Sequence, residues 1–125
     1  MRQWVHAAEA TFALHALAIL YARLHIPKDA PEGTVEALEK GMAANVQKDL
    51  SFLETELSLS SVSGKFLCGD HVTAADVMMQ FSVDFILARE LGTQGKQWPN
   101  INRWLEACGK EEGYRRAVEK TGHKL

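Results

Sequence analysis

The chain has 125 residues, of which 46% are hydrophobic and 24% are charged, with a formal net charge of −2. This length suits one domain with a single core, and the composition is typical of a soluble globular protein. Acidic and basic residues are interspersed along the sequence, which excludes the basic surface that binding to nucleic acid or to an anionic membrane requires.

The two cysteines, Cys68 and Cys108, lie far apart and show no pairing pattern. This favours a reducing compartment, so we expect a cytoplasmic protein. Cys68 and His71 have a spacing that suits metal ligands, but no second pair follows, and we expect neither a metal site nor a resident cofactor. Motifs for phosphate loops, dinucleotide binding and nucleophile elbows are missing from the sequence.

Residues 11–22 contain no Asp, Glu, Lys or Arg. This stretch is shorter than the roughly 20 apolar residues needed to cross a bilayer. It has no basic leader and no small-residue cleavage site. We therefore expect no membrane span and no secretory signal, but a helix that is buried or faces another subunit.

The first predicted helix covers residues 2–25 and ends before Pro27, because proline disfavours helical geometry in the residue that precedes it. Its apolar residues cover more than one face, which indicates burial on two sides. They are Val5, Phe12, Leu17, Leu20 and Leu24. Residues 26–33 hold two of the three prolines and are expected to form a loop.

The second predicted helix begins near Thr34, a plausible N-cap, and ends at a serine-rich break over residues 58–64. Its apolar residues are spaced by three or four, which predicts one continuous stripe. The stripe consists of Val35, Leu38, Met42, Val46, Leu50, Leu53 and Leu57. Such a stripe fits a core face and also fits a helix–helix dimer contact.

The third predicted helix starts with a capping box, in which Thr73 is the N-cap and Asp76 reaches back to its backbone N–H. Val72 and Val77 occupy the positions of a hydrophobic staple across that cap. We expect Asp76 to be buried and to have this structural role, favoured by the helix dipole, instead of acting as a general base. The helix is expected to run to residue 90, with Gly92 marking its C-terminal end.

Pro99 suits the first position of a fourth helix, and the last helix is expected over residues 111–120. Each of these helices carries a small apolar face. The residues are Ile101, Trp104, Leu105 and Cys108 in the fourth, and Tyr114, Ala117 and Val118 in the last. We expect Trp98 and Trp104 to pack inside the protein, while the role of Trp4 is open. Without strand alternation or repeats, the sequence predicts one all-α helical bundle over residues 1–125.

Two segments, FLCGDHVTAAD at residues 66–76 and WPNINRW at residues 98–104, resemble the best-kept signatures of the all-helical C-terminal domain of glutathione transferases. The segment RQWVHAAEA at the start of the first helix and GYRRA at residues 113–117 fit the same domain in the same order. The resemblance covers essentially the whole chain. It implies the same all-α bundle that the helical periodicity predicts.

In that family the first turns of the corresponding helix line the pocket for the electrophilic substrate. The resemblance therefore makes Gln3, His6, Ala7 and Ala10 candidate substrate-binding residues. Their spacing puts them on one helix face, although their side chains carry no catalytic signature, and a bland, partly exposed face fits them equally well.

The resemblance implies no catalytic residue in this chain. Family members bind glutathione, their co-substrate, in a preceding thioredoxin-like domain that supplies the Ser, Tyr or Cys stabilising the thiolate. No βαβ pattern for such a domain occurs in these residues. We therefore expect the chain alone to be inactive, and its partner to be that missing domain.

The resemblance also implies a homodimer formed through the first two helices. An interface left uncovered favours self-association, because monomers seldom expose large apolar patches. A different class of function is equally compatible with the residues: a non-catalytic interaction module, as in the gamma subunit of translation elongation factor or in aminoacyl-tRNA synthetase complexes. A third reading is an unrelated helical bundle that shares only the cap.

Overall fold

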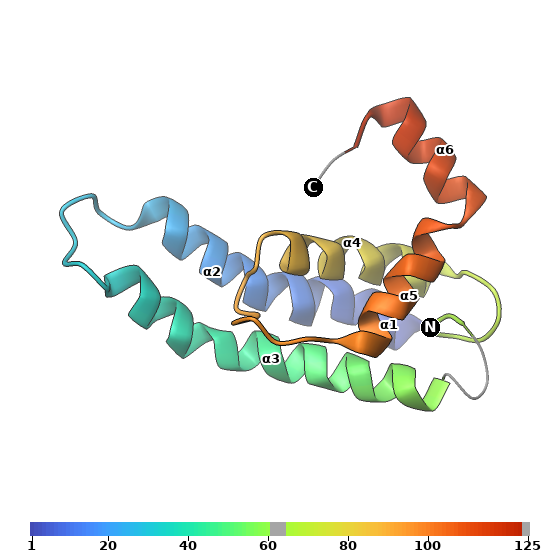
Figure 1. The fold of residues 1–125 in the computed structure, drawn as a ribbon, viewed down its shortest axis with the longest axis horizontal. Coiled ribbons are helices and arrows are strands. Elements are labelled where there is room, and N and C mark those ends of the chain that lie inside the picture. Colours follow the sequence, from blue (N-terminus) through green and yellow to red (C-terminus); the bar gives the residue numbers. More distant parts are fainter. Residues whose placement is uncertain (61–64, 124–125) are drawn as a thin grey trace.

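The structure is a computed structural model that describes residues 1–60 and 65–123. Every regular element in these two ranges is a helix, so the predicted all-α fold is confirmed (Figure 1). The elements are α1 (Arg2–Ala7), η1 (Ala8–Ala13), α2 (Leu14–His25), α3 (Thr34–Ser60), α4 (Ala74–Ala88), α5 (Pro99–Gly109) and α6 (Glu112–Thr121).

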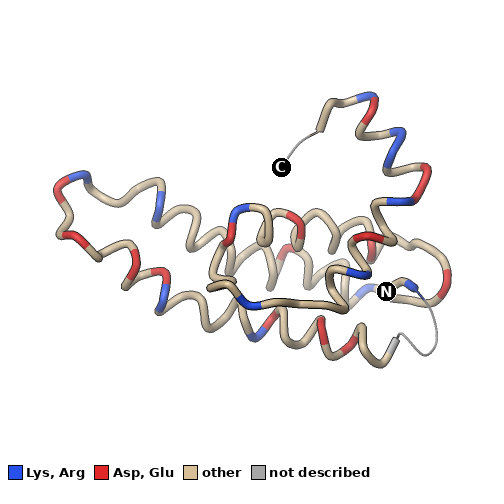
Figure 2. The backbone as a smooth tube through the Cα atoms, in the orientation of Figure 1, with Lys and Arg blue, Asp and Glu red and all other residues tan. Residues whose placement is uncertain are grey.

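The elements α1, η1 and α2 form one long helical run, and α3 returns antiparallel beside it (Figure 1). α4 packs on α1 and η1, and α5 packs on both α3 and α4. These contacts enclose one hydrophobic core. α6 joins the bundle through α5 and points away from it (Figure 1). Acidic and basic residues alternate along α6 and are mixed over the other helices (Figure 2).

The predicted helix over residues 2–25 is present, but its middle is a π-helix, η1, which the sequence pattern did not indicate. A π-helix bonds each carbonyl to the fifth residue onward, so one additional residue fits into the turn. Within it Ala8 and Phe12 are buried, and the Ala8 carbonyl accepts a hydrogen bond from the Ser82 hydroxyl of α4 at 2.9 Å. The run ends at Ile26, whose backbone is extended before Pro27, as predicted.

The run Arg2–His25 is long and apolar enough to cross a membrane, with a mean hydropathy of 1.3. The prediction of no membrane span rested on residues 11–22, which are shorter than this run, and it stays a prediction. Length and composition are weak evidence, because a core helix passes the same test. Here the run packs on α3 and α4 and contributes Ala8, Phe12, Ala16 and Ile19 to the core.

The second helix begins at Thr34, as predicted, but its predicted cap residue and its C-terminal end need correction. The Thr34 hydroxyl donates to the Pro31 carbonyl at 2.6 Å, and it is the Gly33 carbonyl that accepts the Ala37 N–H at 3.0 Å. Gly33 therefore holds the cap position predicted for Thr34. The expected break at Ser58 is also wrong, since α3 continues through Ser60. The Ser58 hydroxyl donates to the Thr55 carbonyl at 2.6 Å, which satisfies it inside the helix. The remainder of the predicted break, residues 61–64, lies outside the described residues.

The predicted stripe on α3 divides into two parts. Its C-terminal half belongs to the core, where Val46, Leu50, Leu53 and Leu57 are buried. Its N-terminal half extends past the end of α4, and Leu38 there remains 45% exposed. The periodicity therefore predicted the correct face of α3. How much of that face is buried depends on where α4 and α5 lie.

α4 ends two residues earlier than predicted, and a residue other than Gly92 occupies the left-handed position. The Leu91 N–H bonds to the Ile86 carbonyl at 3.0 Å, and the Glu90 N–H bonds to the Leu87 carbonyl at 3.3 Å. This is a Schellman motif, in which Glu90 takes the positive φ of 51°. The prediction that Gly92 ends the helix is therefore wrong.

Gly92 has a different role, which is to let the chain after α4 approach α2 and α3 closely. Its φ is 80°, and a Cβ at this position would lie 2.9 Å from Ile19 Cδ1 and 3.2 Å from Ala43 Cα. The Arg23 guanidinium fixes the same region by donating to the Arg89 and Glu90 carbonyls at 2.9 and 3.0 Å.

The α5 N-terminus receives a cap from another helix. Pro99 is the first residue of α5, as predicted. Glu54 of α3 accepts the Asn100 N–H with one carboxylate oxygen and the Ile101 N–H with the other, both at 2.9 Å. A carboxylate in this place satisfies free backbone donors and also lies at the positive end of the helix dipole.

The buried carboxylate of Asp76 joins three parts of the fold. Thr73 and Asp76 form a capping box, in which the Thr73 N–H donates to Oδ2 at 2.9 Å. The other oxygen, Oδ1, accepts the Leu67 N–H at 3.0 Å and the Trp104 indole N–H at 2.9 Å. Asp76 is fully buried, and its purely structural role stays a prediction. The sequence did not predict its hydrogen bond with Trp104, because no local sequence pattern indicates a contact between residues on different helices.

Replacing Gly92 with alanine is expected to destabilise the protein far more than the same change at Gly95. Both glycines have positive φ, but a Cβ at Gly95 meets nothing within 4 Å. A left-handed conformation costs an L-residue about 1–2 kcal/mol, so we expect about that for Gly95→Ala and clearly more for Gly92→Ala. Urea unfolding at one temperature measures both. If both variants lose the same free energy of unfolding, the neighbours of Gly92 can move to accept a Cβ and the prediction is wrong.

The substitutions Asp76→Ala and Trp104→Phe are expected to be coupled. Each removes one side of a buried hydrogen bond, and a buried group left without its partner costs about 1–3 kcal/mol. A double-mutant cycle measured by urea unfolding should therefore give a coupling of about 1 kcal/mol or more. Asp84→Asn, on the same helix outside this network, is the control and should not lower stability. Additive effects at positions 76 and 104 would contradict the proposed junction.

Candidate functional site

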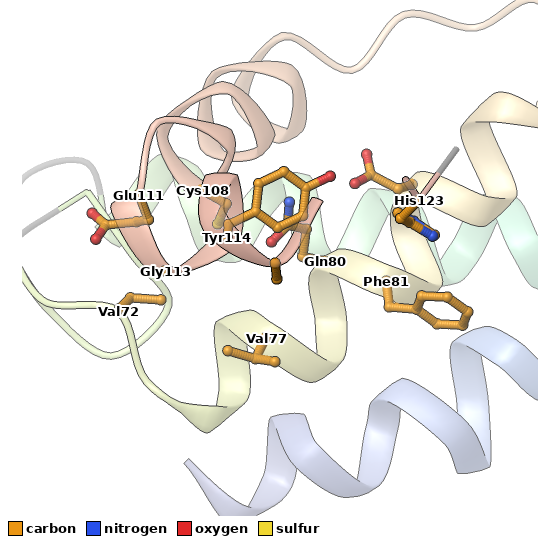
Figure 3. A pocket seen from close by; sticks show the side chains of 11 residues that line it. Val72, Val77, Gln80, Phe81, Cys108, Glu111, Gly113, Tyr114 and His123 are labelled. Atoms are coloured by element: carbon orange, nitrogen blue, oxygen red, sulfur yellow. The ribbon is translucent and has the colours of Figure 1, made fainter. Parts of the chain in front are cut away.

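A pocket of about 440 Å³ lies between α4, α6 and the end of α5 (Figure 3). Its volume falls within the range of roughly 300–1,000 Å³ that small-molecule sites occupy. We call it the α4–α6 pocket. It is lined by Val72, Val77, Gln80, Phe81, Asp84, Cys108, Glu111, Gly113, Tyr114, Ala117 and His123.

The pocket follows from the way α6 leaves the bundle. Val77 and Phe81 are one turn apart on α4 and remain 61% and 60% exposed, because no helix packs over them. α6 contributes Tyr114 and Ala117 to the other side, and none of its residues is fully buried. Since α6 contacts the bundle through α5, the space between α6 and α4 stays open (Figure 3).

The polar side of the pocket centres on Asp84. Burial raises the pKa of this carboxyl above its ordinary value, while a hydrogen bond with Gln80 and the nearby His123 act in the opposite direction. Glu111 lines the pocket close to the start of α6. Among residues 1–60 and 65–123, neither Asp84 nor Glu111 forms an ion pair. The pocket therefore has two carboxyl groups whose charge the described residues do not pair.

The thiol of Cys108 is the natural nucleophile to look for in this pocket, but its surroundings suppress it. Burial, together with the negative charges of Asp76, Asp84 and Glu111, raises the pKa of Cys108 to about 12. Because the thiolate is the reactive form, this thiol is inert near neutral pH. The residues that line the pocket therefore offer no activated thiol.

The structure places the four predicted substrate-binding residues elsewhere. Gln3 and His6 lie on α1, and Ala10 lies on η1; all three are exposed, while Ala7 is half-buried. None of the four lines the α4–α6 pocket. Trp4, left open by the sequence, is buried and packs against the Phe52 ring with 5.6 Å between ring centroids. The assignment of a substrate face to α1 stays a prediction.

The remaining predicted residues divide between packing and the pocket. Trp98 and Trp104 are buried, as expected for packing residues. Val72 and Val77, the predicted staple, both line the α4–α6 pocket and are largely exposed, so the staple contact itself stays a prediction. In the part of the chain that the structure describes, no three His, Cys, Asp or Glu residues are grouped to hold a metal ion.

The sequence contained one local sign of the pocket. Val77, Phe81 and Asp84 recur at helical spacing, and Tyr114 and Ala117 belong, with Val118, to the apolar face of an otherwise polar helix. What the sequence could not provide is that these two faces meet, because this depends on the angle between α5 and α6.

The fold, with its buried capping box and its cross-capped α5, defines an all-α helical-bundle domain. Residues 12–112 match the family model described as "Glutathione S-transferase, C-terminal domain". The chain belongs to this family.

Solved structures show the same fold. Poplar glutathione transferase F1 is 23% identical with a TM-score of 0.69, covering 97% of this chain and 53% of the poplar chain. A serine-to-cysteine variant of that protein is 24% identical with a TM-score of 0.66, covering 94% of this chain and 52% of the other. The chain therefore spans about half the length of these structures. No curated protein matches it.

The two cysteines are expected to react with a thiol reagent at very different rates. Cys68 is exposed, whereas Cys108 is buried with its pKa raised to about 12. With dithiobis-nitrobenzoate at mildly alkaline pH, we expect one fast thiol, which disappears in Cys68→Ser. Cys108→Ser should leave the fast phase unchanged. A fast phase that survives Cys68→Ser would contradict the suppressed reactivity of Cys108.

Proposed function

We propose that this chain is the electrophile-pocket and dimerisation domain of a glutathione transferase-like protein. The observation that carries the proposal is the family match over residues 12–112. The likeness to about half of a poplar glutathione transferase agrees with it. The complete protein would join the glutathione thiolate to an electrophilic carbon, or exchange it in a reductive variant, as in the detoxification of small electrophiles in the cytoplasm.

The chemistry explains why this domain needs a partner. A thiol attacks only as the thiolate, so an enzyme of this kind must lower the pKa of the glutathione thiol. The residues around Cys108 do the reverse, because burial and three nearby carboxyl groups raise the pKa of a thiol there. We infer that thiol activation and glutathione binding belong to a thioredoxin-like domain, and that this chain alone is inactive.

The exposed face of α1 and η1 is the place proposed for the electrophile. Gln3, His6 and Ala10 are open to solvent there, so a second domain packed against them would close a pocket over the substrate. The neighbouring face of α4 carries the exposed Val77 and Phe81. These two adjacent faces give a second domain apolar surface to cover.

The homodimer is proposed to form through the outer faces of α2 and α3. Only 22% of the most apolar window of the run Arg2–His25 is buried, so much of its apolar surface is open. The large exposed apolar residues on these helices are Leu14, Tyr21, Leu24, Leu38, Phe52 and Leu59. Burying them against a second copy removes that surface from water.

The test compares the isolated chain with the endogenous protein. We expect the isolated chain to leave the conjugation of glutathione to chlorodinitrobenzene at the uncatalysed rate. Endogenous protein, captured with an antibody to this domain and heavier than 13.9 kDa by about one small domain, should catalyse it. Conjugation by the isolated chain would overturn the proposal. An inactive endogenous protein of 13.9 kDa would also overturn it and favour the non-catalytic interaction module.

A further inference from the structure

A second pocket, of about 350 Å³, lies past the C-terminal end of α4, where the loop after α4 meets α2 and α3 (Figure 1). We call it the distal pocket. Its volume is within the range of roughly 300–1,000 Å³ that small-molecule sites occupy. The lining residues that matter for its chemistry are Arg23, Glu36, Lys40, Glu90, Thr93 and Gln94.

The distal pocket lies apart from the two surfaces proposed above as interfaces. α4 has 15 residues and is about 22 Å long, and Val77 lies in its first turn, whereas the pocket lies past its last turn. On α3, Lys40 and the exposed Leu38 are two residues apart, so their side chains point about 160° apart around the helix axis. A ligand site here is therefore compatible with a second domain on α4 and with a second copy on α3.

Hydrogen bonds between elements hold the walls of this pocket. The Arg23 guanidinium donates to the Glu39 carboxylate and to two backbone carbonyls just past α4. The Gln47 amide of α3 donates to the Gly92 carbonyl at 3.2 Å and to the side-chain oxygen of Gln94 at 3.1 Å. The charge of Arg23 is thus already paired, and the pocket is formed before a ligand binds.

Thr93 provides hydrogen-bonding groups that the described residues leave unused. Only 6% of this residue is exposed, yet within residues 1–60 and 65–123 neither its N–H nor its hydroxyl has a hydrogen-bond partner. Buried polar groups are nearly always paired, so an unpaired N–H and hydroxyl at the wall of a pocket indicate an acceptor that comes from outside the chain. A carboxylate can accept from both groups.

The exposed rim of the pocket carries both signs of charge. Lys40, Glu36 and Glu90 line it, and none of them forms an ion pair with the part of the chain that the structure describes. A ligand with only a negative charge is repelled by the two glutamates. A ligand with only a positive charge is repelled by Lys40 and leaves the donors of Thr93 without an acceptor. A ligand that carries both charges matches all of these groups.

We propose that the distal pocket binds a free α-amino acid, with its carboxylate at Thr93 and Lys40 and its ammonium group at Glu36 and Glu90. The volume of about 350 Å³ accepts a side chain of moderate size, and the Gln94 amide favours a polar one. The site takes no part in the proposed conjugation. It adds amino-acid recognition at the opposite end of α4 from the surface proposed for a second domain.

The first test uses three probes that share one side chain and differ in charge. Glutamine carries both charges, N-acetylglutamine carries only the carboxylate and glutaminamide, at mildly acidic pH, carries only the ammonium group. By isothermal titration calorimetry with the whole chain at low ionic strength, we expect glutamine to bind about tenfold or more tightly than either of the others. The reason is that each of them lacks one set of charge-assisted hydrogen bonds. No binding of glutamine, or equal binding of a singly charged probe, would overturn the proposal.

Variants of the charged rim locate the site, each with a matched control. Lys40→Gln should weaken glutamine binding about threefold or more, the size expected for an exposed charge pair, whereas Lys48→Gln, on α3 outside the pocket, should not. Glu90→Gln should weaken it similarly, whereas Glu32→Gln, an exposed carboxylate outside the pocket, should not. If the controls weaken binding as much as the rim variants, the attraction is general and the proposal is wrong.

The hydroxyl of Thr93 distinguishes a built site from attraction to surface charge. Thr93→Val keeps the shape and removes the hydroxyl, so it should weaken glutamine binding about threefold or more, whereas Thr93→Ser should retain it. Circular dichroism checks that each variant folds. Full binding by a folded Thr93→Val variant contradicts the proposal. None of these measurements involves conjugating activity, so their outcome is separate from that of the proposed function.

Discussion

The carboxylate of Asp76 is the constraint on which the arrangement of the other elements depends. It is fully buried and accepts hydrogen bonds from the loop before α4, from the cap of α4 and from the Trp104 indole of α5. A buried carboxylate is tolerated only when its oxygens are satisfied, so all three segments must meet at this point. Because α6 is attached to α5, this junction also holds the helix from which α6 departs.

Other helix ends rely on side chains from distant parts of the chain. Glu54 caps α5 from α3, and Arg23 reaches the last carbonyls of α4 from α2. Local rules predict the ends whose partners are close in sequence, such as the Thr73 capping box, Pro27 and Pro99. These rules fail where the capping partner comes from another helix. They also fail where two nearby residues can each take the cap position. Thr34 and Gly92 are examples, because Gly33 and Glu90 take the positions predicted for them.

The candidate site was predictable only in its components. The helical spacing of Val77, Phe81 and Asp84, and the apolar face of the last helix, can be read from the sequence. Their meeting across a pocket depends on the angle at which α6 leaves α5, and no residue pattern encodes that angle alone. The raised pKa of Cys108 likewise arises from its burial and from carboxylates on α4 and at the start of α6. Fold and family were accessible from the sequence, whereas the pocket itself became apparent only in the structure.

The π-helix η1 determines how α1, the helix before it, is rotated about the helix axis. Each residue of an α-helix advances about 100° around the axis, so the one additional residue in η1 turns α1 by about that amount relative to a straight continuation of α2. Trp4 is thereby directed to the core, and Gln3 and His6 are directed outward. The length of this segment is therefore as informative as its composition: deleting a single alanine here would rotate the outward face of α1 while changing none of its side chains.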